Sequence, residues 1–153
     1  MSEQRLIHAT CIGLDGQGVL ITGGSGAGKT QTGLAIYRRA MSAQVYCGFI
    51  SDDQTLLQAD GDPPKLTATC PANIYGKLEV FGHGIIEDPS VFIERAVVTL
   101  VANLVVSEEV ARMAPDDWQK MHGVDLPQMR LPREKPELAA TAIIAAICGH
   151  ARL

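Results

Sequence analysis

Eight consecutive residues, Gly23 to Thr30, have the types and spacing of a phosphate-binding loop. They read Gly-Gly-Ser-Gly-Ala-Gly-Lys-Thr and match the pattern G-x-x-x-x-G-K-[ST] in full. Glycines let the backbone bend so that successive N–H groups converge on phosphate oxygens. Lys29 brings a catalytic positive charge to the β- and γ-phosphates, and the Thr30 hydroxyl suits Mg²⁺. The predicted ATP·Mg²⁺ loop comprises Gly23, Gly24, Ser25, Gly26, Ala27, Gly28, Lys29 and Thr30.

Two adjacent carboxylates, Asp52 and Asp53, follow the apolar segment Val45–Ile50 and Ser51. P-loop proteins commonly place acidic groups beside the bound metal after a buried strand. One carboxylate would then support the metal, and the other would accept a proton from a hydroxyl group. The alternative is that the pair caps the next turn, because Asp favours such positions.

Glu79 and His8 are weaker candidates when each is considered alone. Glu79 lies in the predicted strand Lys77–Phe81, where carboxylates are disfavoured but unremarkable on a solvent-facing side. His8 lies in the apolar segment Leu6–Leu14, and a histidine in such a place is more often a hydrogen-bonded core residue than a catalytic one. The residues alone leave both roles open.

Short strands and two helices are predicted to position these groups. A strand ending at Thr22 precedes the glycine loop, and a helix over Thr30–Met41 follows it, with Arg38 and Arg39 complementing its C-terminal dipole. The predicted strands are Leu6–Leu14, Val19–Thr22, Val45–Ile50, Thr55–Gln58, Lys65–Thr69 and Lys77–Phe81. Strands of this kind separated by turns predict an α/β domain with a mixed sheet.

The type of secondary structure is harder to predict in the second half of the chain. Gly82–Gly84 is predicted to be a flexible link. Arg95–Val106 is almost wholly apolar and fits either a buried strand or a helix, since periodicity alone does not separate the two. Asp116–Met121 is polar and is expected at the surface. Pro136–Gly149 has the alanine content and the final glycine of a helix.

Composition and charge narrow the class of protein. The 153 residues, 46% of them hydrophobic, are enough to bury a core as one domain, residues 1–153. A net charge of −4 without a run of Lys or Arg argues against nucleic acid or an anionic membrane as the main partner. The N-terminus is polar, and no apolar run reaches the roughly 18 residues that a membrane span needs, so we expect a cytoplasmic protein. Its four cysteines are scattered along the sequence and are expected to be reduced thiols.

Taken together, these residues resemble the C-terminal catalytic domain of bacterial HPr kinase/phosphorylase. The resemblance rests on His8, Gly18–Thr30, Ser51-Asp52-Asp53 and Leu78–Ile86. It implies a P-loop on a mixed, twisted sheet, as in HPr kinase and its phosphoenolpyruvate-carboxykinase-like relatives. It also implies a serine kinase that phosphorylates the phosphocarrier protein HPr with ATP, regulates a phosphotransferase system, and removes the phosphate again with inorganic phosphate. The chain would be a short form without the family's N-terminal domain, typical of alphaproteobacteria, and a homo-oligomer, since the family is hexameric.

The resemblance also implies roles for individual residues. His8 would lie close to the phosphates, and Asp53 would be the base toward the serine hydroxyl and the acid in the reverse reaction. Glu79 would hold the metal together with Thr30, beside the support expected from Asp52. Arg112 matches a downstream catalytic arginine that would stabilise charge on the transferring group.

Two departures from the family pattern bear on the reverse reaction. The family usually has an arginine two residues after the glutamate, where this chain has Phe81. The family's Arg-Pro-Gly-Arg-Asn-like loop, implicated in dephosphorylation, is here the altered run Arg133–Glu137. Both changes predict a phosphorylase reaction that is weaker than the kinase reaction. They also keep a rival open, namely an ATP-binding regulator without catalysis or a P-loop kinase with another acceptor.

Overall fold

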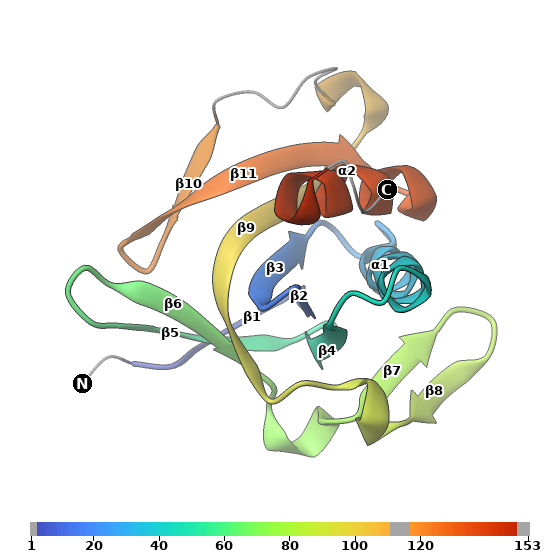
Figure 1. Ribbon diagram of the computed structural model, residues 1–153, viewed down its shortest axis with the longest axis horizontal. Helices are drawn as coiled ribbons and strands as arrows, with labels where there is room; N and C mark the ends of the chain where they lie inside the picture. The colour runs from blue at the N-terminus through green and yellow to red at the C-terminus, as the bar shows by residue number, and fades with distance from the viewer. Residues whose placement is uncertain (1–2, 111–116, 150–153) are drawn as a thin grey trace.

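A nine-stranded mixed sheet forms the frame of the molecule, and the computed structural model describes residues 3–110 and 117–149. Two helices pack on one face of this sheet (Figure 1). Its strands follow the order β1-β5-β6-β9-β3-β2-β4, and β10 and β11 extend it from β9. A separate two-stranded hairpin, β7–β8, stands below the first helix. The prediction of an α/β fold with a mixed sheet is confirmed.

The elements have the following bounds. The strands are β1 (Arg5–Ile7), β2 (Thr10–Leu14), β3 (Gln17–Thr22), β4 (Cys47–Ser51), β5 (Thr55–Asp60), β6 (Lys65–Thr69), β7 (Lys77–Val80), β8 (Gly84–Glu87), β9 (Arg95–Val105), β10 (Trp118–Met121) and β11 (Val124–Pro132). The helices are α1 (Lys29–Ser42) and α2 (Pro136–Cys148), and three 3-10 turns are η1 (Ala72–Ile74), η2 (Pro89–Val91) and η3 (Ser107–Glu109).

Strand β9 joins the parts of the sheet. Its first residues pair antiparallel with β6, and its later residues pair parallel with both β3 and β11. The segment is a strand rather than a helix, and its central part is mostly apolar because both faces of the strand are covered there. Leu100 belongs to the core on the helical side, whereas Val101 belongs to the core on the other face.

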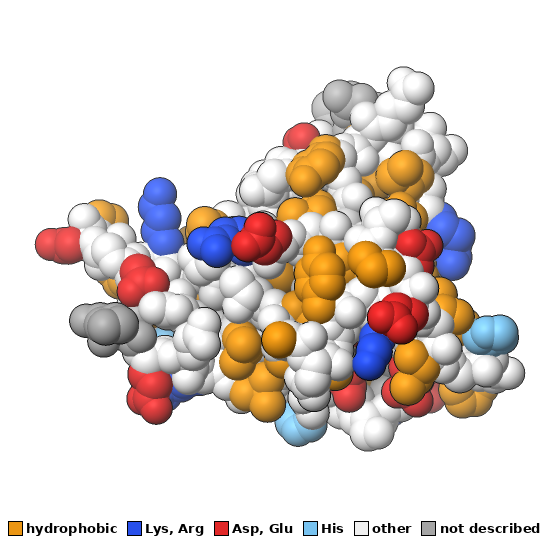
Figure 2. Space-filling view, turned by 90° about the horizontal axis from the view of Figure 1, so that it is seen from below, with side chains coloured by type: hydrophobic (Ala, Val, Ile, Leu, Met, Phe, Trp, Pro, Cys, Tyr) orange, Lys and Arg blue, Asp and Glu red, His pale blue; other side chains and the backbone are white. Residues whose placement is uncertain are grey.

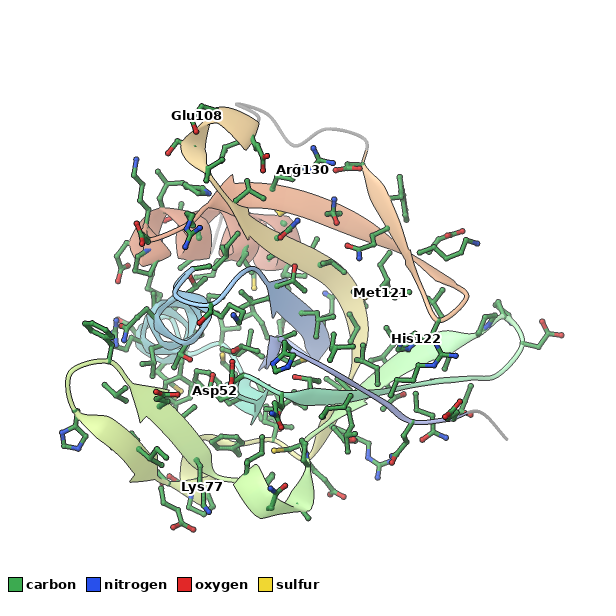
Figure 3. The ribbon with its side chains drawn as sticks, turned by 180° about the vertical axis from the view of Figure 1, so that it is seen from behind. Asp52, Lys77, Glu108, Met121, His122 and Arg130 are labelled. Carbon is green, nitrogen blue, oxygen red and sulfur yellow. The ribbon has the colours of Figure 1, made fainter. Side chains whose placement is uncertain are left out.

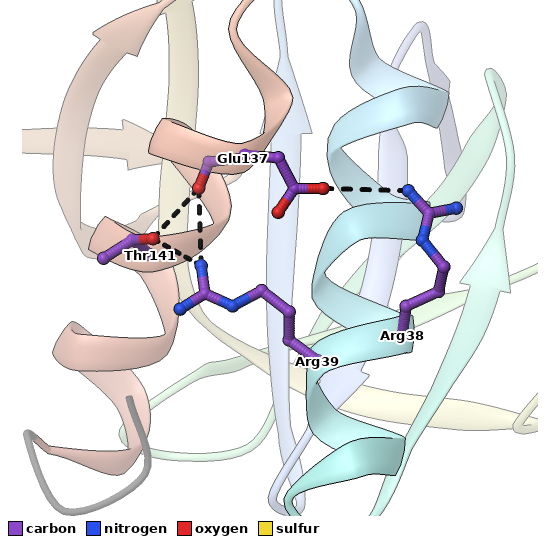
Figure 4. Close-up of polar contacts among 4 residues, drawn as sticks. All are labelled: Arg38, Arg39, Glu137 and Thr141. Carbon is purple, nitrogen blue, oxygen red and sulfur yellow. Dashed lines mark hydrogen bonds and ion pairs between the residues drawn. The ribbon is translucent and has the colours of Figure 1, made fainter.

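The two helices build the larger core together. Ala35 and Ile36 of α1 and Ile143 and Ile144 of α2 are buried in one cluster. At the surface above it, Arg39 donates from its guanidinium to the Glu137 carbonyl, 3.4 Å away, and to the Thr141 hydroxyl (Figure 4). Arg38 approaches the Glu137 carboxylate at 3.8 Å. Both side chains of that ion pair are exposed, so it contributes at most about 1 kcal/mol and the apolar contacts hold the helices together.

Gly33 is required where α1 crosses the core. A Cβ at this position would lie 2.8 and 2.9 Å from two ring atoms of Phe49. Phe49 is fully buried, and its ring packs against those of Tyr37 and Phe92, with centroids 6.4 and 5.9 Å away. The ring therefore has no free space into which it can withdraw.

We expect Gly33→Ala to lower the free energy of unfolding by about 1–3 kcal/mol, because overpacking a filled core forces rotamer and backbone shifts. This sign is opposite to the gain that alanine gives in an ordinary helix. Urea denaturation of the purified protein measures the change. Ser42→Ala, at an exposed position of the same helix, is the control and should change stability by less than about 0.5 kcal/mol. A stabilised Gly33→Ala protein would contradict the packing argument.

Three sequence predictions need correction. The strand predicted over Leu6–Leu14 is broken at His8 and Ala9, because β1 pairs with β5 whereas β2 pairs with β3 and β4. The predicted link Gly82–Gly84 is the tight end of the β7–β8 hairpin. The β10–β11 hairpin was not predicted, since Asp116–Met121 is too polar to signal a strand, although Lys120 and Asp125 form a cross-strand ion pair at 3.3 Å.

Two further expectations concern membrane-spanning segments and the state of the cysteines. Within residues 3–110 and 117–149, no helix has both the length and the apolar character that a bilayer crossing requires. The four cysteines all lie in these ranges and form no disulfide with one another. Burial raises the pKa of Cys47 to about 12, with a further contribution from Cys148 nearby. A thiol with so high a pKa stays protonated at neutral pH.

Candidate active site

The glycine loop connects the end of β3 to the start of α1. Gly23 has φ 154°, and a Cβ there would lie 3.1 Å from Ala27 Cβ and 3.2 Å from Leu104. Gly28 caps α1 in the left-handed region, at φ 94°, and has no side chain to accept from the first N–H groups of the helix. Those groups, with the positive end of the helix dipole, suit a phosphate. The predicted strand, loop and helix are confirmed.

The side chain of Lys29 packs against the backbone of the glycine loop. Its side-chain ammonium donates to the carbonyl oxygens of Gly23 and Gly24, at 3.1 and 3.2 Å. The residue is only 9% exposed. The charge is therefore already held beside the backbone amides that would receive phosphate.

The site forms at one edge of the sheet. Strands β3 and β4 end there and β2 begins there, since β2 runs antiparallel to both. This arrangement brings the glycine loop, the acidic pair after β4 and Thr10 of β2 together. Segments more than 20 residues apart in sequence thus meet at one place because of strand pairing.

Asp52 is the polar centre of this edge and is only 5% exposed. Its Oδ1 accepts hydrogen bonds from the hydroxyls of Thr30 and Thr10, at 2.7 and 2.9 Å. Its Oδ2 accepts the backbone N–H of Glu79 at 3.1 Å. Figure 3 shows Asp52 between α1 and the β7–β8 hairpin. One carboxylate thus connects α1, β2, β4 and β7.

Burial raises the pKa of the Asp52 carboxyl above its usual value, and the neighbouring charge of Asp53 adds to the rise. The hydrogen bonds from Thr30, Glu79 and Thr10 act in the opposite direction. Desolvation is the largest of these effects, so an ionised Asp52 is costly unless a positive charge lies near it. A cation bound at this edge would supply that charge.

The residues at this edge fit Mg²⁺. This ion binds a protein through one or two oxygen ligands and keeps waters and substrate phosphates as the others. The Thr30 hydroxyl and the Asp52 carboxylate, 2.7 Å apart, are oxygen donors of this kind. In the part of the chain that the structure describes, no group of three or more His, Cys, Asp or Glu side chains is placed to hold a metal. Thr30 and Asp52 could therefore supply one or two of the ligands of a metal whose other ligands are waters and phosphates.

Asp53 differs from Asp52 in both exposure and backbone conformation. It is exposed, and its φ of 66° is in the left-handed region, which is uncommon for a residue other than glycine. Its backbone N–H donates to the Thr10 hydroxyl at 3.2 Å. A strained conformation held by surrounding contacts is a frequent property of functional residues. Burial separates the two carboxylates into an inner group and an outer, accessible one.

Thr10 is a positioning residue that the sequence did not reveal. Its hydroxyl donates to Asp52 and accepts from the backbone of Asp53. A threonine at the start of a strand is common, so nothing local distinguished it. Its role follows from the pairing of β2 with β4.

Glu79 and His8 lie around the same edge. The backbone of Glu79 contacts Asp52, while its side chain is exposed on β7. His8 is exposed and lies two residues before Thr10, so the interpretation of this histidine as a core residue is wrong. Arg112 lies outside the described residues.

The altered basic loop lies directly against the glycine loop. The backbone N–H of Glu134 donates to the Ala27 carbonyl at 3.0 Å, and that of Arg133 donates to the Val105 carbonyl at 2.8 Å. Glu134 has φ 60°, so this chain holds a residue with a side chain in a conformation that favours glycine. The run Arg133–Glu137 is thus placed beside the phosphate-binding loop.

Comparison with known proteins gives one consistent answer. The family model described as HPr serine kinase C-terminal domain matches residues 1–152. The HPr kinase/phosphorylase of Chlorobaculum tepidum is 31% identical over 134 residues, which are 82% of this chain and 37% of that protein. That of Limosilactobacillus reuteri is 29% identical over 143 residues, 86% of this chain and 42% of that protein. The chain therefore spans less than half the length of these curated relatives.

A solved structure agrees in fold. The Hpr(Ser) kinase/phosphatase from Coxiella burnetii superposes with a TM-score of 0.78 at 23% identity, covering 96% of this chain and 90% of that one. At this identity the likeness shows the shared fold. The match of the family model over almost the whole chain shows more, and the chain belongs to the HPr serine kinase C-terminal domain family.

Proposed function

We propose that this protein is an ATP-dependent serine kinase that acts on the phosphocarrier protein HPr. One observation carries the proposal. The hydroxyl that ends the glycine loop, Thr30 Oγ1, is bonded to the buried Asp52 carboxylate at 2.7 Å, and the exposed Asp53 follows immediately. Two oxygen donors that suit a metal and an exposed carboxylate therefore lie close to the glycine loop, and this arrangement supports the proposal. The names of the relatives supply HPr as the acceptor.

In the proposed reaction, the serine oxygen of HPr forms a bond to the γ-phosphorus of ATP. The bond from that phosphorus to the β,γ-bridging oxygen breaks, and ADP leaves. Asp53 accepts the proton of the serine hydroxyl, and Lys29 opposes the negative charge of the phosphates. Mg²⁺, held by Thr30 and Asp52 with Glu79 beside them, would neutralise phosphate charge. His8 is proposed to lie near the same phosphates, and Arg112 is proposed to stabilise charge on the transferring group.

The experiment that tests this is transfer of label from γ-labelled ATP to purified HPr of the same organism. We expect Mg²⁺-dependent labelling, and HPr whose acceptor serine is replaced by alanine is the control. ATP binding without transfer to HPr would instead support the rival, an ATP-binding regulator or a kinase with another acceptor. The same proposal includes a cytoplasmic location and a homo-oligomer, whose size sedimentation of the purified protein measures.

The reverse reaction should be weaker than the forward one. Phosphorolysis holds inorganic phosphate beside phosphoserine, and two anions in one pocket need several cations. Phe81 offers no donor, and Glu134 brings a carboxylate into the loop that contacts Ala27. We therefore expect the kinase reaction to persist at a reduced rate and the phosphorylase reaction to be slower still.

Release of pyrophosphate from serine-phosphorylated HPr in millimolar phosphate measures the reverse rate. Phe81→Arg restores the family residue and is expected to raise phosphorolysis more than kinase activity. Pyrophosphate release by the unaltered protein as fast as the forward reaction would show that Phe81 is harmless.

A further inference from the structure

The β7–β8 hairpin exposes two large apolar side chains beside the candidate active site. Phe81 is 92% exposed and Ile85 is 71% exposed. Phe81 is the most exposed large hydrophobic residue in the described part of the chain. Figure 2 views the molecule from the side on which the hairpin lies in Figure 1, and hydrophobic side chains show at the hairpin's end of that face.

Packing against the core does not account for the apolar character of Phe81 and Ile85. The other face of the hairpin makes the contact with the core, through Leu78, which is 2% exposed, and the partly buried Ile86 opposite it. Side chains alternate between the two faces of a strand. Ile85 therefore lies on the outer face, and Phe81 lies in the turn after β7. Both side chains are so exposed that they add little to packing within the chain.

The strand register places this outer face next to the catalytic groups. Ile85 lies directly opposite Glu79 across the hairpin, so these two share one side. Phe81 lies in the turn that follows β7, two residues after Glu79. The backbone N–H of Glu79 is bonded to Asp52 at 3.1 Å. A molecule that contacts Phe81 and Ile85 is thus adjacent to the carboxylates at the end of β4.

We propose that the exposed surface of the β7–β8 hairpin, formed by Ile85 of β8 and Phe81 of the turn, is a docking surface for an apolar patch on the acceptor protein. This inference rests on the proposed function. A protein acceptor must bring its serine to Asp53, so part of its surface has to lie against the elements around that edge. The hairpin presents apolar area there, and apolar contact suits a protein acceptor better than water or inorganic phosphate.

The size of the surface favours a transient partner over a second copy of this chain. Stable protein interfaces cover roughly 800 Å² on each partner, far more than two side chains provide. A small apolar contact beside the reacting groups binds an acceptor and still lets the phosphorylated product leave. A few buried apolar side chains commonly carry most of the binding energy of such contacts.

The test is the steady-state kinetics of HPr phosphorylation by Phe81→Ser, Ile85→Ser and the double variant. We expect the KM for HPr to rise roughly tenfold or more in the double variant, since burial of apolar area contributes that much to affinity. The kcat and the KM for ATP should stay within about twofold. Phe81→Leu should restore most of the affinity, because leucine keeps the apolar area.

Tyr46→Ser is the matched control. Tyr46 is 65% exposed and precedes β4, at the opposite end of that strand from Asp52, so its loss should leave the KM for HPr unchanged. Thermal melts of all variants check the fold, which should hold because Phe81 and Ile85 are exposed.

Three results would overturn the docking proposal while leaving the proposed kinase intact. An unchanged KM for HPr would show that the hairpin does not contact the acceptor. A raised KM for ATP alone would assign the two side chains to the nucleotide. A smaller oligomer in the double variant, with an unchanged KM for HPr, would assign them to contact between copies. Failure of the unaltered protein to phosphorylate HPr is the separate result that would remove the proposed function and the docking surface together.

Discussion

Replacing Lys29 with alanine is expected to abolish phosphoryl transfer and to weaken ATP binding by about 2–3 kcal/mol, because a charge-assisted contact to buried phosphate is lost. Lys29 is almost buried and its ammonium already lies within the loop. A water molecule therefore cannot readily replace the contact that the Lys29 ammonium would make with phosphate. The substitution should have the largest effect on activity of any single change in the glycine loop.

Transfer of label to HPr and ATP titration by calorimetry measure the two effects of Lys29→Ala. The variant also loses two hydrogen bonds to the carbonyls of Gly23 and Gly24, so its unfolding must be measured without nucleotide. Arg38→Ala is the control, because it removes a positive charge from an exposed position of the same helix and should leave both transfer and ATP affinity unchanged. Near-normal turnover in Lys29→Ala would contradict the assignment of the loop.

Asp53→Asn is expected to lower the rate of phosphoryl transfer by roughly 10²–10⁴-fold, the usual contribution of a general base. ATP affinity and stability should change little, because Asp53 is exposed and its backbone, rather than its side chain, makes the contact with Thr10. Single-turnover kinetics with saturating ATP and HPr measure the loss.

Asp52→Asn is the matched comparison, since the two residues are neighbours with different surroundings. Asp52 accepts three hydrogen bonds and is buried, so its amide variant should raise the Mg²⁺ concentration needed for activity. Asp53→Asn should not change that requirement. If Asp52→Asn were the crippling change and Asp53→Asn mild, the roles within the pair would be reversed.

The sequence by itself determined the parts of the site that are made by local backbone. The loop Gly23–Thr30 could be predicted because glycines, a lysine and a hydroxyl at these spacings are typical of a phosphate-binding loop. The strand and the helix on either side of it are as predicted. The adjacency of Asp52 and Asp53 was likewise visible. Short-range geometry follows from a few neighbouring residues, so a pattern is enough to reveal it.

The tertiary structure determined which of these groups contact one another and which are buried. Only the antiparallel pairing of β2 with β4 brings Thr10 to Asp52, and only burial at that edge makes Asp52 the inner carboxylate and Asp53 the outer one. The strand type of β9 was also decided by its partners on both sides. The exposure of Ile85 depends on which face of the hairpin meets the core. These properties arise from contacts between residues far apart in the chain, and such contacts leave no local pattern in the residues that make them.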